Sequence, residues 1–234
     1  MRLNKYLADS GVSSRRESER IVTSGRVKIN GKTITDINIP VNDNDTVSVD
    51  GNTVKPIKKQ YYIMLHKPKG YITSAKDELG RKTVMQLIDI KARLFPIGRL
   101  DYDTEGLLLL TNDGELANIL THPKHRIGKT YLVRLSGQLS TDSIQQLEKG
   151  VIIDGETTQP AIVDIISGDV HNTRLNITIF EGKNHQIKKM FDAVGHQVEF
   201  LKRIAIGEIK LGGLTRGTYR DLNKKELEYL NSLK

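Results

Sequence analysis

Two aspartates and an arginine lie close together in residues 98–106, a short polar stretch between two apolar runs. The stretch follows residues 94–97 and leads into residues 106–110, which predicts a loop before a buried segment. Carboxylates on a loop that a rigid scaffold holds are typical of a reactive site, and Asp101 and Asp103 are the candidates. A solvated turn explains the same residue types and is the more frequent case.

Glycoside hydrolysis is one chemistry that such a loop could support. A glycosidase would pair Asp101 with a second acid across the bond that it cleaves. Asp103 and Glu105 are the neighbouring acids, but their spacing in the sequence does not establish the separation that this chemistry requires. The hypothesis predicts release of a free base or sugar, which a product assay detects.

Length and composition indicate a folded protein. The chain has 234 residues, of which 37% are hydrophobic, enough for one large domain or for a large and a small one. The longest apolar run, residues 106–110, is far shorter than the roughly 20 residues that span a bilayer, and the N-terminus has no apolar signal core. We therefore expect a cytoplasmic protein without a membrane partner.

Metal and thiol chemistry are not indicated. The sequence contains no cysteine, which excludes disulfides, thiolate metal sites and a cysteine nucleophile. Its six histidines show no spacing typical of metal ligands. We predict no metal site.

The formal net charge of +8 suggests a polyanionic partner, and most of this charge lies near the N-terminus. Residues 1–32 hold eight basic and three acidic side chains, a net charge of +5. The basic residues are Arg2, Lys5, Arg15, Arg16, Arg20, Arg26, Lys28 and Lys32. A solubilising face explains such charge almost as well as RNA or DNA does, because clustered cations neutralise phosphates without specificity.

Local signals predict two helices and a small sheet in this basic head. Ser14 and Glu17 have the spacing of a capping box at the start of the second helix. Asn30 and Gly31 follow a short strand and form a strong hairpin signal.

A polar, basic segment separates the head from the rest of the chain. Residues 55–60 contain Pro56 and lysines and are predicted to be a linker between a domain of residues 1–54 and a larger domain of residues 61–234. In the larger domain, periodicity predicts helices near residues 115–120, 141–149 and 187–194 and from residue 224, with strands at residues 61–65, 129–135 and 175–180.

The head resembles the S4 RNA-binding domain. The likeness lies in Arg-Leu-Asn-Lys-Tyr-Leu from residue 2, Gly-Val-Ser-Ser-Arg-Arg from residue 11 and Gly-Arg-Val-Lys-Ile-Asn-Gly-Lys from residue 25. In that family the second helix and the turn after it face RNA, which carries over to Arg15, Arg16, Arg26 and Lys28. Each of these residues alone is equally typical of an exposed salt-bridge partner.

The remainder resembles the RsuA/RluB branch of the ribosomal RNA pseudouridine synthases. The motifs that carry the likeness appear in the family's order: Lys-Pro-Lys-Gly from residue 67, Gly-Arg-Leu-Asp from residue 98, Lys-x-Tyr from residue 129 and His-Gln-Ile from residue 185. The resemblance covers essentially the whole chain. It implies an α+β fold, with a small S4-like domain followed by a larger synthase domain built on a mostly antiparallel mixed sheet.

The resemblance also implies roles for individual residues. Asp101 takes the place of the catalytic aspartate, Tyr131 that of the tyrosine against the target base, and Lys188 that of the cation that keeps the aspartate ionised. Many relatives carry arginine at the last position, whereas lysine makes only a single-point contact. Arg99 is expected to contact the RNA backbone or to keep the bases apart. By residue type alone, Tyr131 is typical of a strand aromatic and Lys188 of a surface lysine.

The implied activity is isomerisation of uridine to pseudouridine in ribosomal RNA, without a cofactor, because the uracil is kept. The motifs at residues 67–70 and 101–104 look nearer to the RluB members, which act on 23S RNA, than to the RsuA members, which act on 16S RNA. A 16S substrate is one alternative. A non-catalytic S4 ribosome-assembly factor is another, and it predicts that Asp101→Ala leaves every activity intact. A monomer is expected.

Overall fold

The computed structural model describes residues 1–234, which divide into two compact units. One unit comprises Met1–Gln60 with Lys91–Arg93, and the other comprises Tyr61–Ile90 with Leu94–Lys234. Each unit has its own cluster of buried apolar side chains. No helix in either unit has the length and apolar character that crossing a bilayer requires.

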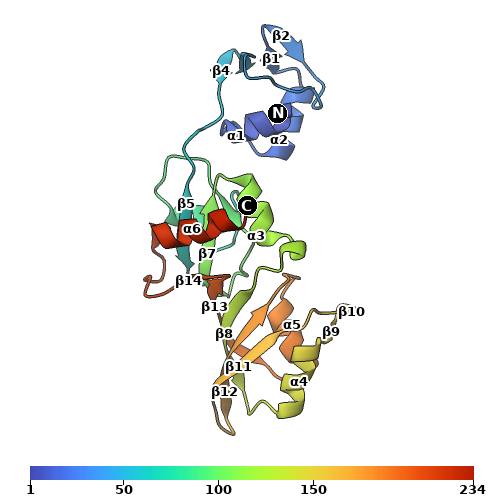
Figure 1. The fold of residues 1–234 in the computed structure, drawn as a ribbon, viewed down its shortest axis with the longest axis vertical. Coiled ribbons are helices and arrows are strands. Elements are labelled where there is room, and N and C mark those ends of the chain that lie inside the picture. Colours follow the sequence, from blue (N-terminus) through green and yellow to red (C-terminus); the bar gives the residue numbers. More distant parts are fainter. The chain divides into compact units, whose positions relative to one another are not determined.

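The first unit packs two short helices against a four-stranded antiparallel sheet with the strand order β2-β1-β3-β4 (Figure 1). Its elements are α1 (Leu3–Asp9), α2 (Arg15–Thr23), β1 (Val27–Ile29), β2 (Lys32–Ile34), β3 (Val47–Val49) and β4 (Asn52–Val54). Leu3, Leu7 and Val22 of the helices have no exposed surface and pack with Val27 and Val47 of the sheet. Burial of each such side chain stabilises the unit by about 1.5–3 kcal/mol.

Local signals set the boundaries of these elements. The Glu17 amide donates to Ser14 Oγ at 3.1 Å, which caps the start of α2 as predicted. Asn30 and Gly31 both have positive φ, 50° and 81°, the backbone of a tight turn that matches the twist of the two strands. The predicted β1–β2 hairpin is therefore confirmed.

The second unit is built on a nine-stranded sheet in which β11-β12-β8-β13-β7-β5-β15 form the main path. The strands are β5 (Tyr62–Lys67), β6 (Phe95–Ile97), β7 (Glu105–Thr111), β8 (Lys129–Ser136), β11 (Ile162–Gly168), β12 (Asn172–Ile179), β13 (Val198–Ile206), β14 (Ile209–Lys210) and β15 (Tyr219–Asp221). A separate hairpin pairs β9 (Ile152–Ile153) with β10 (Glu156–Thr157). Only β7 and β13 run parallel, so the sheet is mixed and mostly antiparallel, as predicted.

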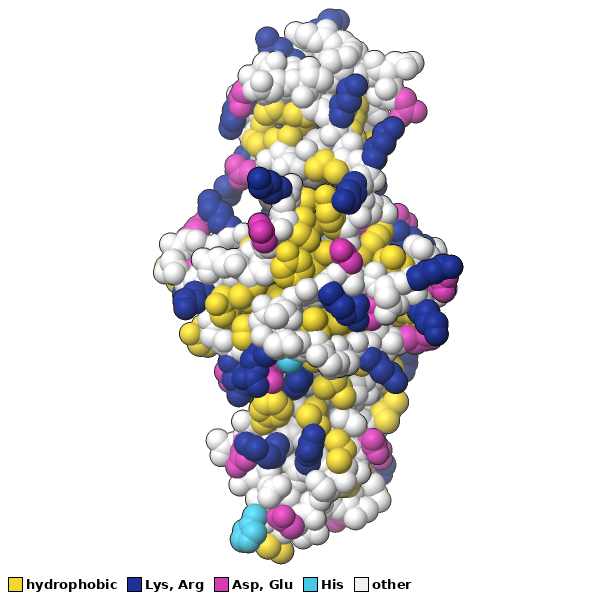
Figure 2. All heavy atoms as spheres, turned by 90° about the vertical axis from the view of Figure 1, so that its left-hand side faces the viewer, with side chains coloured by type: hydrophobic (Ala, Val, Ile, Leu, Met, Phe, Trp, Pro, Cys, Tyr) yellow, Lys and Arg dark blue, Asp and Glu magenta, His cyan; other side chains and the backbone are white.

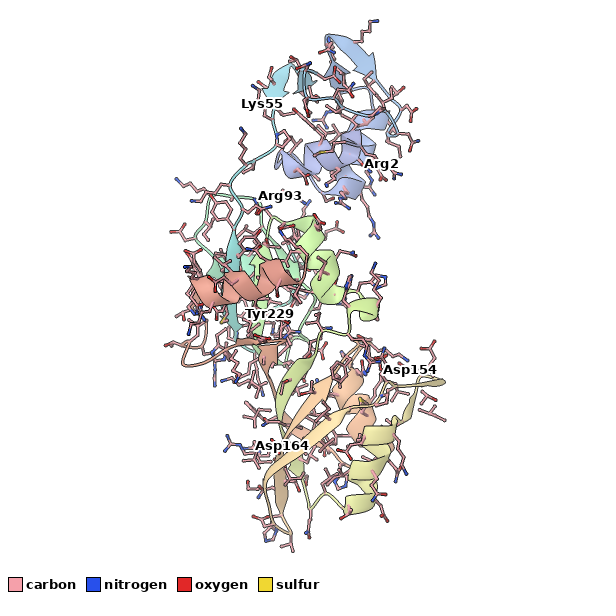
Figure 3. All side chains as sticks on the ribbon, in the orientation of Figure 1. Arg2, Lys55, Arg93, Asp154, Asp164 and Tyr229 are labelled. Atoms are coloured by element: carbon pink, nitrogen blue, oxygen red, sulfur yellow. The ribbon has the colours of Figure 1, made fainter.

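Helices cover the sheet of the second unit, and in Figure 1 α6 lies across the strands β5 and β7. The helical elements are α3 (Gly114–Thr121), α4 (Thr141–Lys149), α5 (Gln186–Ala193) and α6 (Lys224–Ser232), with short 3-10 turns η1 (Val84–Leu87) and η2 (Pro123–His125). Leu116 of α3 and Leu230 of α6 pack with Leu107 and Leu109 of β7. Tyr229, labelled in Figure 3, lies on α6.

β7 is the most buried strand and directly follows the Asp101 loop. All seven of its residues are buried, so the sheet is covered on both faces here. Gly106 adjoins β13, and a Cβ added to it would lie 2.2 Å from the Arg203 carbonyl oxygen. Glycine is thus required where the two parallel strands meet, and this contact places Arg203 beside the base of the loop.

Candidate active site

The loop that carries Asp101 connects β6 to β7, and hydrogen bonds to its backbone hold it in place. Thr73 Oγ1 donates to the Leu100 carbonyl oxygen at 2.8 Å, and the Leu100 amide donates to Thr73 Oγ1 at 3.2 Å. The Leu100 side chain is buried. The Thr104 amide donates to the Asp101 carbonyl oxygen at 3.2 Å and closes a turn. The Asp101 side chain, 30% exposed, therefore projects from a fixed backbone.

Lys67, at the end of β5, fixes the same loop from inside the protein. Its side chain is completely buried, and its Nζ donates to the carbonyl oxygens of Asp101 and Thr104, both at 2.8 Å, and of Pro68 at 3.1 Å. Burial disfavours the charged amine and lowers the pKa of Lys67 from 10.5 to about 8. Three carbonyl acceptors matched to three donors satisfy this buried ammonium group.

A cavity of about 400 Å³ opens beside the loop. Its lining includes Arg99, Asp101, Lys129, Tyr131, His185 and Arg203. Asp101 is the one carboxylate in the lining, whereas several of the other residues are cationic. The cavity thus combines a single acid with an aromatic ring in an electropositive surrounding.

His185 lies close to the Asp101 carboxylate. Its Nε2 lies 3.6 Å from Asp101 Oδ1, and the imidazole is about half exposed. His185 directly precedes α5 and has a positive φ of 51°, which is uncommon for a residue with a side chain. Two ion pairs hold this segment, because Lys183 pairs with Glu156 and Lys189 with Asp154 of the β9–β10 hairpin.

Lys188 contacts Asp103, not Asp101, and this corrects the expected pairing. Its Nζ lies 2.6 Å and 2.7 Å from the two carboxylate oxygens of Asp103, and this hydrogen bond lowers the pKa of the Asp103 carboxyl. Lys188 does not line the cavity. The two aspartates are separated by one residue in a closed turn, so that Asp103 meets α5 while Asp101 borders the cavity.

Tyr131 and Arg203 occupy facing positions in the paired strands β8 and β13. The Tyr131 ring is 8% exposed and lines the cavity, and the Arg203 guanidinium carbon lies 6.0 Å from the ring centroid. Arg203 itself is 2% exposed. Its Nε donates to the Leu107 carbonyl oxygen at 2.7 Å and its Nη1 to that of Arg99 at 3.4 Å.

The remaining predicted RNA contacts are exposed side chains. Arg15 and Arg16 lie at the start of α2, and Lys28 lies on β1. Arg26 is held by Asp50, because its Nε and Nη2 donate to the two carboxylate oxygens. Lys and Arg side chains are spread over the face shown in Figure 2, with Asp and Glu between them.

Sequence reasoning missed three residues of the site: Lys67, His185 and Arg203. Lys67 lies at the end of an apolar strand, and its burial gave no signal beyond the family motif. Arg203 did give a signal, because it alternates with Leu201 and Ala205 on the buried face of β13. No group of three or more His, Asp or Glu side chains is placed to hold a metal ion.

Comparison with known proteins identifies the family. Residues 61–193 match the model of the RNA pseudouridylate synthase family, and residues 1–47 match the S4 domain. The chain belongs to the RNA pseudouridine synthases. Within them it is of the RsuA/RluB type, with an S4 domain ahead of the catalytic domain.

The similarity to related synthases extends over nearly the full chain. An RNA pseudouridine synthase of Aquifex aeolicus is 45% identical, with 98% of this chain and 93% of the relative covered. Ribosomal large subunit pseudouridine synthase B of Bacillus subtilis is 42% identical, with 99% and 96% covered. A crystal structure of a pseudouridylate synthase superposes with a TM-score of 0.72 at 35% identity, covering 98% of this chain and 99% of the other. The synthase is therefore an isomerase that acts on RNA.

Proposed function

We propose that this synthase converts a uridine of 23S ribosomal RNA to pseudouridine, with Asp101 as the catalytic aspartate. The observation that carries the proposal is the position of Asp101, the single carboxylate of the cavity, on a loop that Lys67 fixes from inside. The choice of RNA rests on similarity to a Bacillus subtilis enzyme named for the large ribosomal subunit.

The reaction requires access to both the sugar and the base of the target nucleotide. The bond between C1′ and N1 breaks, the uracil turns, and C5 bonds to C1′. C5 then loses a proton and N1 gains one. Because these atoms are not accessible within a helix, the nucleotide has to leave its stack. Asp101 acts either as nucleophile at C1′ or as base at C2′, and both routes need an ionised carboxylate beside the sugar.

The neighbouring residues support this role of Asp101. Tyr131 offers an aromatic ring on which a pyrimidine can stack. Lys188 acts through Asp103, since their ion pair joins α5 to the loop that presents Asp101. Arg99 is exposed at the cavity and contacts the RNA backbone or keeps neighbouring bases apart. No cofactor is required, because the uracil is retained and no redox change occurs.

The S4 domain binds the structured RNA substrate by its shape and phosphates in this proposal. Arg15, Arg16, Arg26 and Lys28 are the contacts that we propose, and Arg26 would exchange Asp50 for RNA or contact it beside Asp50. We propose further that the enzyme acts as a cytoplasmic monomer, with residues 1–54 and 61–234 as its two domains.

Pseudouridine mapping tests the proposal directly. Ribosomal RNA from cells that lack the gene is modified with carbodiimide and analysed by primer extension, after complementation with wild type, Asp101→Ala or Asp142→Asn. Asp142 is an exposed aspartate at the start of α4 and serves as the matched control. We expect one 23S position to lose its signal in the deletion strain and to regain it with wild type and Asp142→Asn only.

Each other outcome of the mapping contradicts a different part of the proposal. A 16S position that behaves in this way overturns the choice of RNA but keeps the catalytic assignment. Restoration of the signal by Asp101→Ala overturns the role of Asp101. Absence of any change in ribosomal RNA rejects the proposed substrate class.

A further inference from the structure

Arg203 is a buried cation of the active-site cavity that has no acidic partner. Its side chain is 2% exposed, and its hydrogen bonds go to backbone carbonyl oxygens and not to a carboxylate. Nε and Nη1 donate to backbone carbonyl oxygens, whereas the buried Nη2 has no hydrogen-bond partner. A buried charge without a counterion costs several kcal/mol, and a buried donor without an acceptor adds to that cost. An arrangement of this kind is typical of a functional site.

The charges around Arg203 favour an anionic occupant of the cavity. Lys129 also lines the cavity, and its pKa is lowered by burial and, secondly, by the nearby Arg203. Arg99 adds further positive charge to the lining, whereas Lys183 is paired with Glu156, and Asp101 is the single carboxylate. Preorganised buried cations stabilise negative charge more strongly than cations in water do.

Two groups of the RNA could bring negative charge to Arg203: a backbone phosphate, or the uracil as it leaves C1′. The position of Arg203 favours the uracil. Arg203 lies opposite Tyr131 in the sheet, with its guanidinium carbon 6.0 Å from the ring centroid. A pyrimidine stacked on Tyr131 is flat, and its carbonyl oxygens reach Nη2, which is covered in the free protein, when the guanidinium turns toward the cavity. The exposed side chain of Arg99 is better suited than this buried group to a phosphate of the RNA backbone.

We propose that Arg203 is a further catalytic residue, whose Nη2 donates a hydrogen bond to a carbonyl oxygen of the uracil as the C1′–N1 bond breaks. The proposal rests on the proposed function of Asp101. The electron pair of the broken bond goes to the uracil and is shared between N1, O2 and O4. Asp101 bonds to C1′ or removes the proton of C2′. When C5 bonds to C1′, either the Asp101–C1′ bond breaks and frees the carboxylate, or Asp101 returns its proton to C2′. The negative charge on the uracil is then neutralised, C5 releases its proton and N1 is protonated.

Because this charge develops only as the bond breaks, Arg203 is expected to act on the rate more than on RNA affinity. The test uses an RNA fragment around the mapped uridine, made with uridine or 5-fluorouridine at that position, under single-turnover conditions. The readout is consumption of the original nucleoside. We expect Arg203→Gln to lower the rate of uridine consumption on the order of 100-fold, the usual loss when one hydrogen-bond donor to a developing charge is removed. RNA affinity should change little.

The fluorinated base makes the test specific to the leaving group. Fluorine at C5 stabilises negative charge on the ring, so 5-fluorouracil needs less help from Arg203. We expect the deficit of Arg203→Gln to be clearly smaller with 5-fluorouridine than with uridine. An equal deficit with both bases, or a loss confined to RNA affinity, overturns the proposal and indicates a structural role or a phosphate contact.

Two further variants separate chemistry from folding. Arg203→Lys retains a cation and should recover part of the rate, and its thermal melting shows whether the strand tolerates a change. Lys202→Gln, on the neighbouring position of β13 and outside the cavity lining, is the matched control and should react as wild type does. A wild-type enzyme that leaves the RNA fragment unchanged contradicts the proposed function itself, whereas an active Arg203→Gln contradicts only the role of Arg203.

Discussion

Lys67 links the pH of the solution to the geometry of the Asp101 loop. The protonated amine places one donor on each of three carbonyl oxygens, two of them in the loop. Because burial lowers the pKa of Lys67 to about 8, one of these donors is lost as the pH rises through that value. We expect the single-turnover rate of pseudouridine formation to fall with an apparent pKa near 8, measured from pH 6 to about 9.5.

The lowered pKa of Lys67 also affects stability. Its contribution to the free energy of unfolding changes with pH in the direction opposite to the rate. The folded protein releases the Lys67 proton near pH 8, whereas the unfolded chain holds it to about the ordinary value of 10.5. Unfolding between these values takes up a proton, so the contribution of Lys67 to the free energy of unfolding rises with pH. The variant Lys67→Met has no such proton and should be slow at every pH without the fall near 8. A fall that persists in this variant would assign it to another group.

The ion pair of Lys188 and Asp103 gives a second prediction for single residues. If Lys188 acts only through Asp103, then Lys188→Ala and Asp103→Ala should lower kcat/KM by the same factor. That factor is expected to be a few-fold, because a partly exposed ion pair contributes about 0–1 kcal/mol. The double variant should be no worse than either single variant. The measurement is a double-mutant cycle on kcat/KM.

A much larger loss in Lys188→Ala than in Asp103→Ala would contradict this interpretation. It would indicate that Lys188 contacts Asp101 or the RNA during the reaction. Asp103→Asn, which keeps the shape of the side chain, separates the charge of Asp103 from its packing.

The sequence motifs predicted which residues would gather, but not every contact between them. Arg99 and Asp101 belong to one loop and Tyr131 to the distant strand β8, and all three line one cavity. The partner of Lys188 could not be predicted, because two aspartates lie in one turn and the direction of each depends on contacts from β5 and α5. Arg203 alternates with apolar residues, yet alternation alone does not distinguish a covered strand from a half-exposed one.

At the scale of elements, the parallel contact of β7 with β13 positions both the Asp101 loop and Arg203. Gly106 has a φ of 118°, and an added Cβ would lie 2.2 Å from the Arg203 carbonyl oxygen and 2.6 Å from its amide nitrogen. Neither backbone atom can move without breaking the sheet. We expect Gly106→Ala to lower the free energy of unfolding by at least about 3 kcal/mol, measured by urea denaturation.

Gly213→Ala is the control for this substitution. Its φ is not in the left-handed region, and no atom lies within 4 Å of an added Cβ. Its effect on stability should stay within about 0.5 kcal/mol. Equal stability of Gly106→Ala and wild type would show that β7 and β13 do not approach as closely as described.

Elements with strong local signals were predictable, whereas long-range pairing was not. The helix predicted at residues 141–149 is α4, because Ser140 caps its first turn and apolar residues recur at helical spacing. Residues 200–222 have the pattern of short strands, but β13 has nine residues and is central to the sheet. Its pairing with β7 joins residues about a hundred positions apart, which periodicity within one segment cannot reveal.

At the scale of the whole molecule, most of the net positive charge and the catalytic residues belong to different units. Residues 1–32 hold a net charge of +5 out of +8, whereas Asp101, Tyr131 and the cavity lie in the second unit. This division separates affinity from chemistry, because phosphate contacts on the S4 domain contribute to RNA binding without touching the reacting atoms. Substitutions in the first unit should therefore change the RNA concentration needed for activity and its dependence on salt.

The double variant Arg15→Gln/Arg16→Gln tests this separation. If each arginine neutralises one phosphate, the slope of log Kd against log salt should fall by about 1 to 2, and KM should rise while kcat at saturating RNA is unchanged. Arg134→Gln is the matched control, because this exposed arginine lies on β8 outside the S4 domain and pairs with Glu199, and the slope should not change. A lower kcat in the double variant would instead show that the S4 domain positions the uridine for reaction.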